Sequence, residues 1–143
     1  MHIRDVMTPN PRTVTPNDTI QNAAQVMRDE DTGAVPVVDN GRAVGMVTDR
    51  DIVVRAVADG SAPSRRVSEI VTSAVVTATP DMSTRDAAQL MSEHQIRRLP
   101  VVENERLVGI VSLGDIAVKE GKDSRSGDTL QAISEGVKER ERG

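Results

Sequence analysis

The chain repeats itself, and this repeat constrains the fold more than any other feature. Sliding the sequence by 64 residues places 3–56 over 67–120 without a gap, and 19 of the 54 aligned pairs are identical. Ala-Ala-Gln at 23–25 recurs at 87–89, and Pro-Val-Val at 36–38 recurs at 100–102. Chance does not place so many identities in one register, so the sequence predicts two copies of one supersecondary unit. Neither copy alone has much core, so we expect them to pack together.

Each copy is predicted to contain the same elements in the same order. A helical turn leads into a short extended segment, an amphipathic helix, a β-hairpin and a last helix. In the amphipathic helix of the first copy, Ile20, Ala23 and Met27 fall on one face. The expected ranges are 4–7, 12–15, 19–30, 34–39, 42–47 and 49–58 in the first copy, and 68–71, 75–78, 83–94, 99–103, 106–111 and 113–120 in the second.

Local signals fix the ends of some of these elements. Asp18 with Gln21, and Ser83 with Asp86, have the spacing of capping boxes at the start of the long helices. Asn40 and Gly41 are a strong hairpin turn signal. The equivalent turn at 104–105 pairs Asn with Glu, which is weaker because Glu tolerates positive φ poorly.

The repeat also sets the expected boundaries along the chain. We expect a first repeat at 1–60, a linker at 61–66, a second repeat at 67–121 and a polar C-terminal tail at 122–143. The linker is rich in Ser and Pro. In the tail, Leu130, Ile133 and Val137 share one face of a predicted helix.

Composition excludes several classes of function. The chain has no Cys, Phe, Tyr or Trp and a net charge of -4. Disulfides, thiolate metal sites and cysteine nucleophiles are therefore impossible, and so is base stacking on aromatic rings. The negative charge argues against binding of nucleic acid through its phosphates. No apolar run spans a membrane and no signal peptide is visible, so we expect a cytoplasmic protein without membrane or nucleic-acid partners.

The motif that ends each hairpin resembles that of the CBS (cystathionine β-synthase) domain. Residues 45–51 read Gly-Met-Val-Thr-Asp-Arg-Asp and residues 109–115 read Gly-Ile-Val-Ser-Leu-Gly-Asp, each after a Pro-Val-Val strand. The two copies resemble a tandem CBS pair, or Bateman module, over residues 3–120. Residues 48–53 and 93–100 are similar to small stand-alone bacterial CBS-pair proteins of the hypoxic-response type. The resemblance implies a mixed α/β (α+β) fold of two β-α-β-β-α repeats packed with pseudo-two-fold symmetry.

The same resemblance implies a function. CBS pairs commonly bind adenine nucleotides, such as AMP, ADP, ATP or S-adenosylmethionine, in clefts between the repeats, and commonly form dimers. The motif aspartates, Asp51 and Asp115, are implied to hold a ribose. The Asp115 cleft is implied to include Thr32 and Gly33 from the other repeat, and the Asp51 cleft is implied to include Ile96.

The motif residues have a structural interpretation beside this functional one. Thr48 with Asp51, and Ser112 with Asp115, are spaced as capping boxes at a strand-to-helix junction. A carboxylate at such a junction also accepts charge-assisted hydrogen bonds from ribose hydroxyls, while the helix N-terminus favours phosphate. Both roles are compatible, so we expect capping by Thr48 and Ser112 together with ligand contact by all four residues.

Two arginines break the symmetry between the copies. Arg97 and Arg98 stand where the first copy has Gly33 and Ala34. A guanidinium suits phosphate, so one or both of these arginines are candidate ligand contacts. They could equally be exposed arginines that pair with neighbouring acids. Since neighbours on a strand point to opposite faces, we favour Arg98.

We therefore expect a non-enzymatic module that binds an adenine nucleotide and signals to an effector protein. The alternative is a ligand-free stress-response or interaction protein that acts through its dimer surface. No catalytic motif is present, no metal site is expected from His2 and His94, and no cofactor is obligatory. The segment 52–58 is apolar nearly all round, which predicts that a second copy covers part of it in a homodimer.

Overall fold

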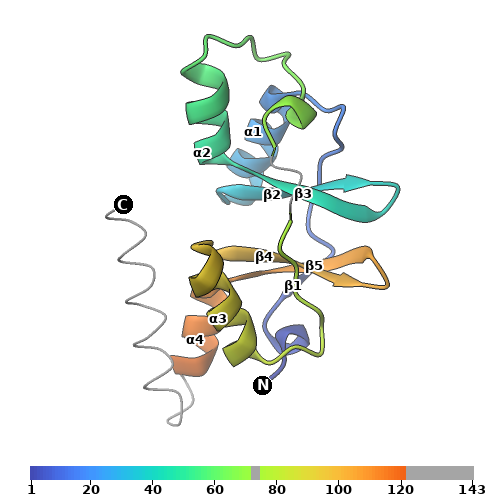
Figure 1. The fold of residues 1–143 in the computed structure, drawn as a ribbon, viewed down its shortest axis with the longest axis vertical. Helices are drawn as coiled ribbons and strands as arrows, with labels where there is room; N and C mark the ends of the chain where they lie inside the picture. Colours follow the sequence, from blue (N-terminus) through green and yellow to red (C-terminus); the bar gives the residue numbers. More distant parts are fainter. Residues whose placement is uncertain (72–74, 122–143) are drawn as a thin grey trace. The chain divides into compact units, whose positions relative to one another are not determined.

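The structure, a computed structural model, describes residues 1–71 and 75–121 and divides into two compact units (Figure 1). The first-repeat unit contains Asn10–Val76 and Asn104–Leu107. The second-repeat unit contains Met1–Pro9, Thr77–Glu103 and the described chain from Val108. The compact units therefore have other boundaries than the sequence repeats, because each takes in a short piece of chain from elsewhere. The predicted tail at 122–143 lies outside the described residues.

In the first-repeat unit, a long helix comes before a β-hairpin, and a short helix that continues as a π-helix comes after it. β2 and β3 are antiparallel, with Val35 opposite Val47. Arg42 of β3 also pairs with Arg106, the first residue of β5 (Arg106–Ser112). The elements are α1 (Ile20–Glu30), β2 (Ala34–Asp39), β3 (Arg42–Thr48), α2 (Asp49–Asp51), the π-helix η2 (Ile52–Val57) and the 3-10 turn η3 (Val67–Glu69).

The second-repeat unit has the same order of elements, but its last helix differs. It is a continuous α-helix, α4 (Leu113–Gly121), where the first-repeat unit has α2 followed by the π-helix η2. β4 pairs with β5, and the two residues of β1 also pair with β5, Thr8 opposite Ile110. The elements are η1 (Ile3–Asp5), β1 (Thr8–Pro9), α3 (Thr84–His94), β4 (Arg98–Glu103), β5 (Arg106–Ser112) and α4 (Leu113–Gly121). The mixed α/β fold of repeated elements is confirmed, whereas the pseudo-two-fold packing remains a prediction. The expected extended segments appear only as single parallel bridges, Val14 to Val37 and Ala78 to Val101.

Each unit is completed by a 3-10 turn that the sequence repeat assigns to the other copy. Ile3 is fully buried in the second-repeat unit, and its N–H donates to Met82 O at 2.8 Å. Val67 is fully buried in the first-repeat unit, and its N–H donates to Asp18 O, also at 2.8 Å. These are the same contacts in both units, since each partner is displaced by 64 residues.

The helix caps correct one sequence prediction. Ser83 caps α3 as expected, accepting from Asp86 N at 3.0 Å. The cap of α1 is Thr19, which accepts from Asn22 N at 3.1 Å, and not Asp18. The Asp18 carboxylate instead accepts from Thr15 N at 2.7 Å and so closes the preceding turn. Asp18 is one residue too early, because Thr19 is the residue that aligns with Ser83.

The two hairpin turns have the same backbone conformation despite their different residues. Asn40 and Gly41 have φ of 53° and 82°, and Asn104 and Glu105 have φ of 53° and 68°. Glu105 therefore occupies the left-handed region that its side chain disfavours. Its carboxylate lies 3.2 Å from the Arg42 guanidinium, in an ion pair whose two side chains are mostly exposed.

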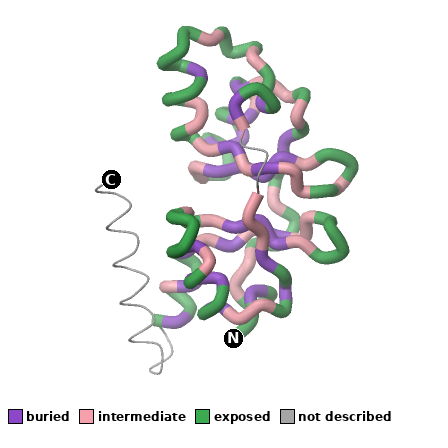
Figure 2. The backbone as a smooth tube through the Cα atoms, viewed as in Figure 1, coloured by how far each residue is buried: buried purple, intermediate pink, exposed green. Residues whose placement is uncertain are grey.

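The core of each unit lies between its helices and one face of its strands (Figure 2). Val35, Val37 and Val47 are buried in the first-repeat unit, as Leu99, Val101 and Val111 are in the second. One pair of equivalent core positions is apolar in the first-repeat unit and polar in the second. Ile20 and Ala56 are buried in the first-repeat unit, whereas their counterparts Thr84 and Glu120 are buried in the second and hydrogen-bond each other.

We call η1 and η3 the exchanged turns, because each lies in the compact unit of the other repeat. Burial of η1 leads to a stability prediction. We expect Ile3→Ala to lower the free energy of unfolding by about 2–5 kcal/mol, because it leaves a cavity at a fully buried side chain. Urea unfolding measures the change, and hydrogen exchange should locate it in α3. The control is Arg85→Ala at an exposed position of α3, which should cost little. An equal effect of the two variants would contradict the anchoring role of Ile3.

Candidate functional site

The candidate site lies at the junction where each hairpin runs into a helix. β3 ends at Thr48 before α2, and β5 ends at Ser112 before α4. Thr48 Oγ1 accepts from Asp51 N at 3.0 Å, and Ser112 Oγ accepts from Asp115 N at 2.9 Å. The predicted capping role of both hydroxyls is therefore confirmed. It places each motif aspartate in the first turn of the helix that follows.

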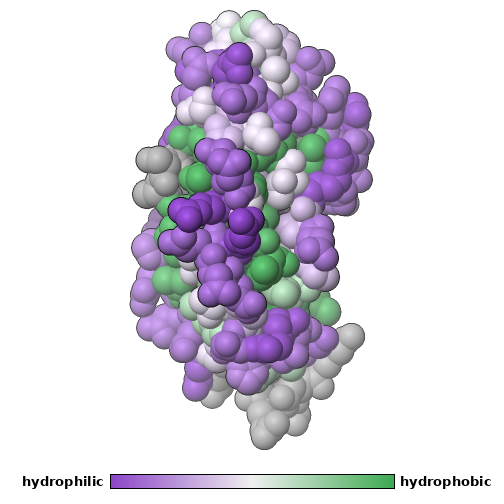
Figure 3. Space-filling view, turned by 90° about the vertical axis from the view of Figure 1, so that its right-hand side faces the viewer, coloured by the Kyte–Doolittle hydropathy of each residue, from purple (hydrophilic) through white to green (hydrophobic). Residues whose placement is uncertain are grey.

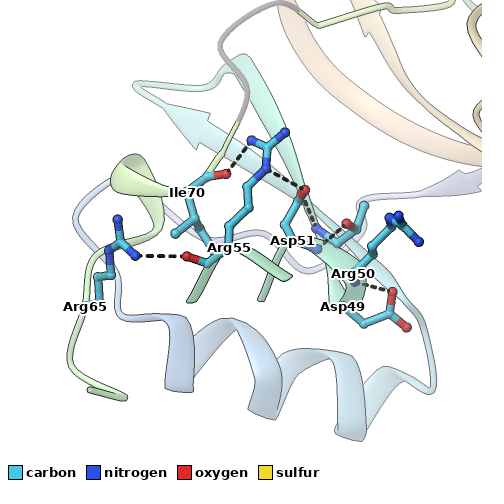
Figure 4. A network of polar contacts seen from close by, with 7 residues as sticks. Asp49, Arg50, Asp51, Arg55, Arg65 and Ile70 are labelled. Carbon is cyan, nitrogen blue, oxygen red and sulfur yellow. Dashed lines mark hydrogen bonds and ion pairs between the residues drawn. The ribbon is translucent and has the colours of Figure 1, made fainter. Parts of the chain in front are cut away.

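The carboxylate of Asp51 is engaged within its own unit (Figure 4). Its Oδ2 accepts from Thr48 N at 3.0 Å, which completes the capping box. Its Oδ1 lies 3.8 Å from Arg55 Nε, one helical turn further on. The Asp51 side chain is 19% exposed and that of Arg55 is 51% exposed, so this ion pair is partly shielded from solvent.

Arg55 is held in place from a second direction. Its Nη1 donates to Ile70 O at 3.0 Å, in the turn that follows η3. Its own carbonyl accepts from Arg65 Nη1 at 3.1 Å, and Figure 4 shows the three residues side by side. Arg55 thus links η2, which contains it, to the residue that follows η3 and to the Asp51 carboxylate.

Asp115 is in a different state at the equivalent position. It is exposed, and among residues 1–71 and 75–121 no hydrogen bond or ion pair engages its carboxylate. Lys119, the counterpart of Arg55, donates to Asp5 O at 3.2 Å and pairs with no carboxylate in that part of the chain. Within the described part of the chain, both oxygens of Asp115 are therefore without a donor.

The residue that faces each junction also differs between the units. Asp49 N donates to Gly33 O at 2.9 Å, and Leu113 N donates to Arg97 O at 2.7 Å. A Cβ at Gly33 would lie 3.0 Å from Asp49 Oδ2, so the carboxylate of Asp49 occupies the space beside the glycine. The first-repeat unit thus has Gly33 where the second has the exposed Arg97. It has the acidic Asp49 where the second has a buried leucine.

The remaining predicted residues lie near these junctions. Thr32 Oγ1 donates to Ala34 O at 3.2 Å and so serves the turn before β2. Arg98 begins β4 and is half-buried, and Ile96 is half-buried with its N–H bonded to Met91 O.

The units therefore group the predicted residues into two sets. Ser112, Asp115 and Arg97 come together in the second-repeat unit. Thr48, Asp51 and Gly33 come together in the first-repeat unit, near Thr32. The implied exchange of Thr32, Gly33 and Ile96 between the two clefts stays a prediction.

Sequence reasoning missed two residues, Asp49 and Arg55. The repeat alignment contains the signal for both, since it places Asp49 over Leu113 and Arg55 over Lys119. Their importance depends on side-chain contacts that spacing alone does not reveal.

Residues 1–71 and 75–121 contain no group of three or more His, Cys, Asp or Glu side chains that could hold a metal ion. In the same part of the chain, no helix has the length and apolar character needed to cross a membrane.

Comparison with known proteins defines the class. The model of the CBS domain family matches residues 3–57 and 67–119. The chain therefore belongs to the CBS domain family, and the two matches make it a tandem pair, as the repeated motif predicts. The CBS domain-containing protein YhcV of Bacillus subtilis (strain 168) is 48% identical over 132 residues, which cover 92% of this chain and 94% of YhcV.

Solved structures share the fold. Hypoxic response protein I, crystallised with two coordinated zinc ions, has a TM-score of 0.77 and 38% identity, covering 82% of this chain and 98% of its own. This likeness confirms the predicted hypoxic-response type. This chain has no cysteine, so thiolate ligands for zinc are absent from it.

Two further structures contain ligands. The CBS domain pair of MJ0100, in complex with 5′-methylthioadenosine and S-adenosylmethionine, has a TM-score of 0.78 and 32% identity, covering 87% of this chain and 98% of that one. CBSX2, in complex with AMP, has a TM-score of 0.74 and 25% identity, covering 85% and 96%.

The caps generate a prediction that is independent of any ligand. We expect Ser112→Ala to lower the free energy of unfolding by about 0.5–2 kcal/mol, because Asp115 N loses its acceptor. The measurement is urea unfolding of the ligand-free protein. Ser112→Thr keeps the hydroxyl and should retain most of the stability. If the alanine variant were as stable as the wild type, the capping role would be wrong.

Proposed function

We propose that this protein is a non-enzymatic regulatory module that binds an adenosine derivative at the Asp115 motif and signals to a partner protein. The candidate ligands are AMP, ADP, ATP and S-adenosylmethionine, with no obligatory cofactor. The proposed working form is a homodimer in the cytoplasm.

The observation that carries this proposal is the state of Asp115. Asp115 is exposed and lies in the first turn of α4. Within the described part of the chain, no other side chain contacts its carboxylate through a hydrogen bond or an ion pair. A carboxylate in this state accepts hydrogen bonds from both hydroxyls of a ribose, and charge-assisted bonds are the strong kind.

The solved relatives support the choice of ligand class. The compounds named in the MJ0100 and CBSX2 complexes share adenosine and differ at the 5′ position. A site that recognises the ribose therefore suits all of them. The substituent at the 5′ position would then be selected by the residues around the motif.

Arg97 and Arg98 are the residues proposed to select that substituent. The Arg97 carbonyl is bonded to Leu113 N, so its backbone lies next to the motif. Arg98 follows as the first residue of β4. A guanidinium there favours a phosphate over an uncharged group.

The homodimer is proposed from the surface of η2. The segment η2 lies on the left in Figure 1, away from the face shown in Figure 3, where apolar side chains, in green, are scattered among hydrophilic ones, in purple. Val53, Val54 and Val57 are 57%, 52% and 63% exposed, on a segment of only six residues. Three exposed valines so close together are a site that a second copy would cover.

The same valines favour a second candidate function. A protein that carries an apolar dimer surface and one engaged motif aspartate, Asp51, could act through that surface alone. In this alternative the chain is a ligand-free stress-response or interaction protein. Ligand titration separates the two functions.

The ligand site gives the first test. We expect Asp115→Ala to weaken AMP binding roughly tenfold to a hundredfold, because hydrogen bonds involving a charged group contribute about 1.5–3 kcal/mol. Arg98→Ala should also weaken AMP binding strongly. Calorimetry on the ligand-free protein measures both affinities.

The matched control is Asp51→Ala in the other repeat, which should change AMP affinity less. Equal losses from Asp51→Ala and Asp115→Ala would contradict the assignment to the second repeat. If the wild type bound neither AMP, ADP, ATP nor S-adenosylmethionine, the proposed function would be wrong.

The dimer gives the second test. Light scattering at micromolar concentration should report twice the 15.4 kDa chain mass for the wild type. Val53→Glu should convert the protein to the single-chain mass, because an unpaired charge buried in an interface costs several kcal/mol. Arg85→Glu changes the charge of an exposed residue on α3 and should leave the mass unchanged. A wild type at the single-chain mass would refute the homodimer.

A further inference from the structure

The two motif aspartates differ in the contacts that their carboxylates already make, and this difference bears on how many ligands a chain binds. Asp51 Oδ2 accepts from Thr48 N, and Asp51 Oδ1 lies beside Arg55 Nε. Asp115 has neither contact within residues 1–71 and 75–121. A ribose that used Asp51 would have to displace or share bonds that a ribose at Asp115 would find open.

The cation one turn after the aspartate is the discriminating residue. Arg55 and Lys119 occupy the same repeat position, four residues after Asp51 and Asp115. Each donates to a backbone carbonyl, Lys119 to Asp5 O at the end of η1 and Arg55 to Ile70 O, one residue after the end of η3. A guanidinium has several N–H groups in a fixed fork, so Arg55 reaches the carbonyl through Nη1 while its Nε faces the carboxylate. Lysine has a single nitrogen, which in Lys119 is directed to the carbonyl.

A second feature acts in the same direction. Asp49 places a carboxylate beside Gly33, where the second-repeat unit has Arg97 beside Leu113. A negative side chain at this place repels a phosphate, whereas an arginine attracts one. The first-repeat motif is thus disfavoured for a nucleotide by its engaged ribose acceptor and by its charge.

We infer that Arg55 closes the first-repeat motif, so that each chain binds one adenosine derivative, at Asp115. Arg55 is a positioning residue in this account, since it acts by holding the Asp51 carboxylate. The inference rests on the proposed function, which it deepens by assigning stoichiometry and the residue that sets it.

The test is a calorimetric titration of the full chain with S-adenosylmethionine and, separately, with AMP. The wild type should bind one ligand per chain. Arg55→Leu removes the guanidinium and should reveal a second site for S-adenosylmethionine, strengthened roughly tenfold by the loss of one charge-assisted contact. AMP should gain less at this second site, because Asp49 remains. Arg55→Gln, which retains a donor for Ile70 O, should show the same gain if the leucine variant does not fold.

The matched control is Lys119→Leu, which removes a cation at the same repeat position and should leave one site per chain. Backbone amide shifts locate the sites: residues 112–116 should respond to ligand in the wild type, and residues 48–52 only in the Arg55 variants. Two equal sites in the wild type, or one site in both Arg55 variants, would overturn the inference and leave the proposed function standing. A wild type that binds neither probe would overturn both.

Discussion

Burial of an exchanged 3-10 turn is the interaction on which both units depend. Ile3 completes the unit that contains α3 and α4, and Val67 completes the unit that contains α1 and η2. The cation of the last helix is anchored close to each turn, Lys119 by Asp5 O at the end of η1 and Arg55 by Ile70 O directly after η3. Neither sequence repeat therefore contains all the residues of a compact unit.

On this common frame, a few substitutions give the two junctions different chemistry. Thr48 and Ser112 make the same cap, so the backbone presents both aspartates alike. Arg55 engages Asp51, whereas within residues 1–71 and 75–121 no side chain engages the Asp115 carboxylate. The two motifs thus share one backbone conformation, while only the first has its aspartate committed to side-chain contacts within the described residues.

The sequence was sufficient to predict the repeat, the family, the long helices and both hairpins, because periodicity and turn residues are local signals. It was not sufficient for the packing units, since the exchange of Ile3 and Val67 depends on contacts distant along the chain. It also missed the π-helix η2 and the cap at Thr19. The capping role of Ser112 was predictable from spacing. The engagement of Asp51 was not, because an ion pair with Arg55 depends on where the guanidinium is held.

We propose Asp115, and not Asp51, as the acceptor for an adenosine derivative. The most direct measurement is a titration of isotope-labelled protein with AMP, followed by the backbone amide resonances of residues 48–52 and 112–116. The account predicts saturable shifts at 112–116, lost in Asp115→Ala, with the amides of 48–52 unmoved. Shifts confined to 48–52, or equal shifts at both motifs, would contradict it.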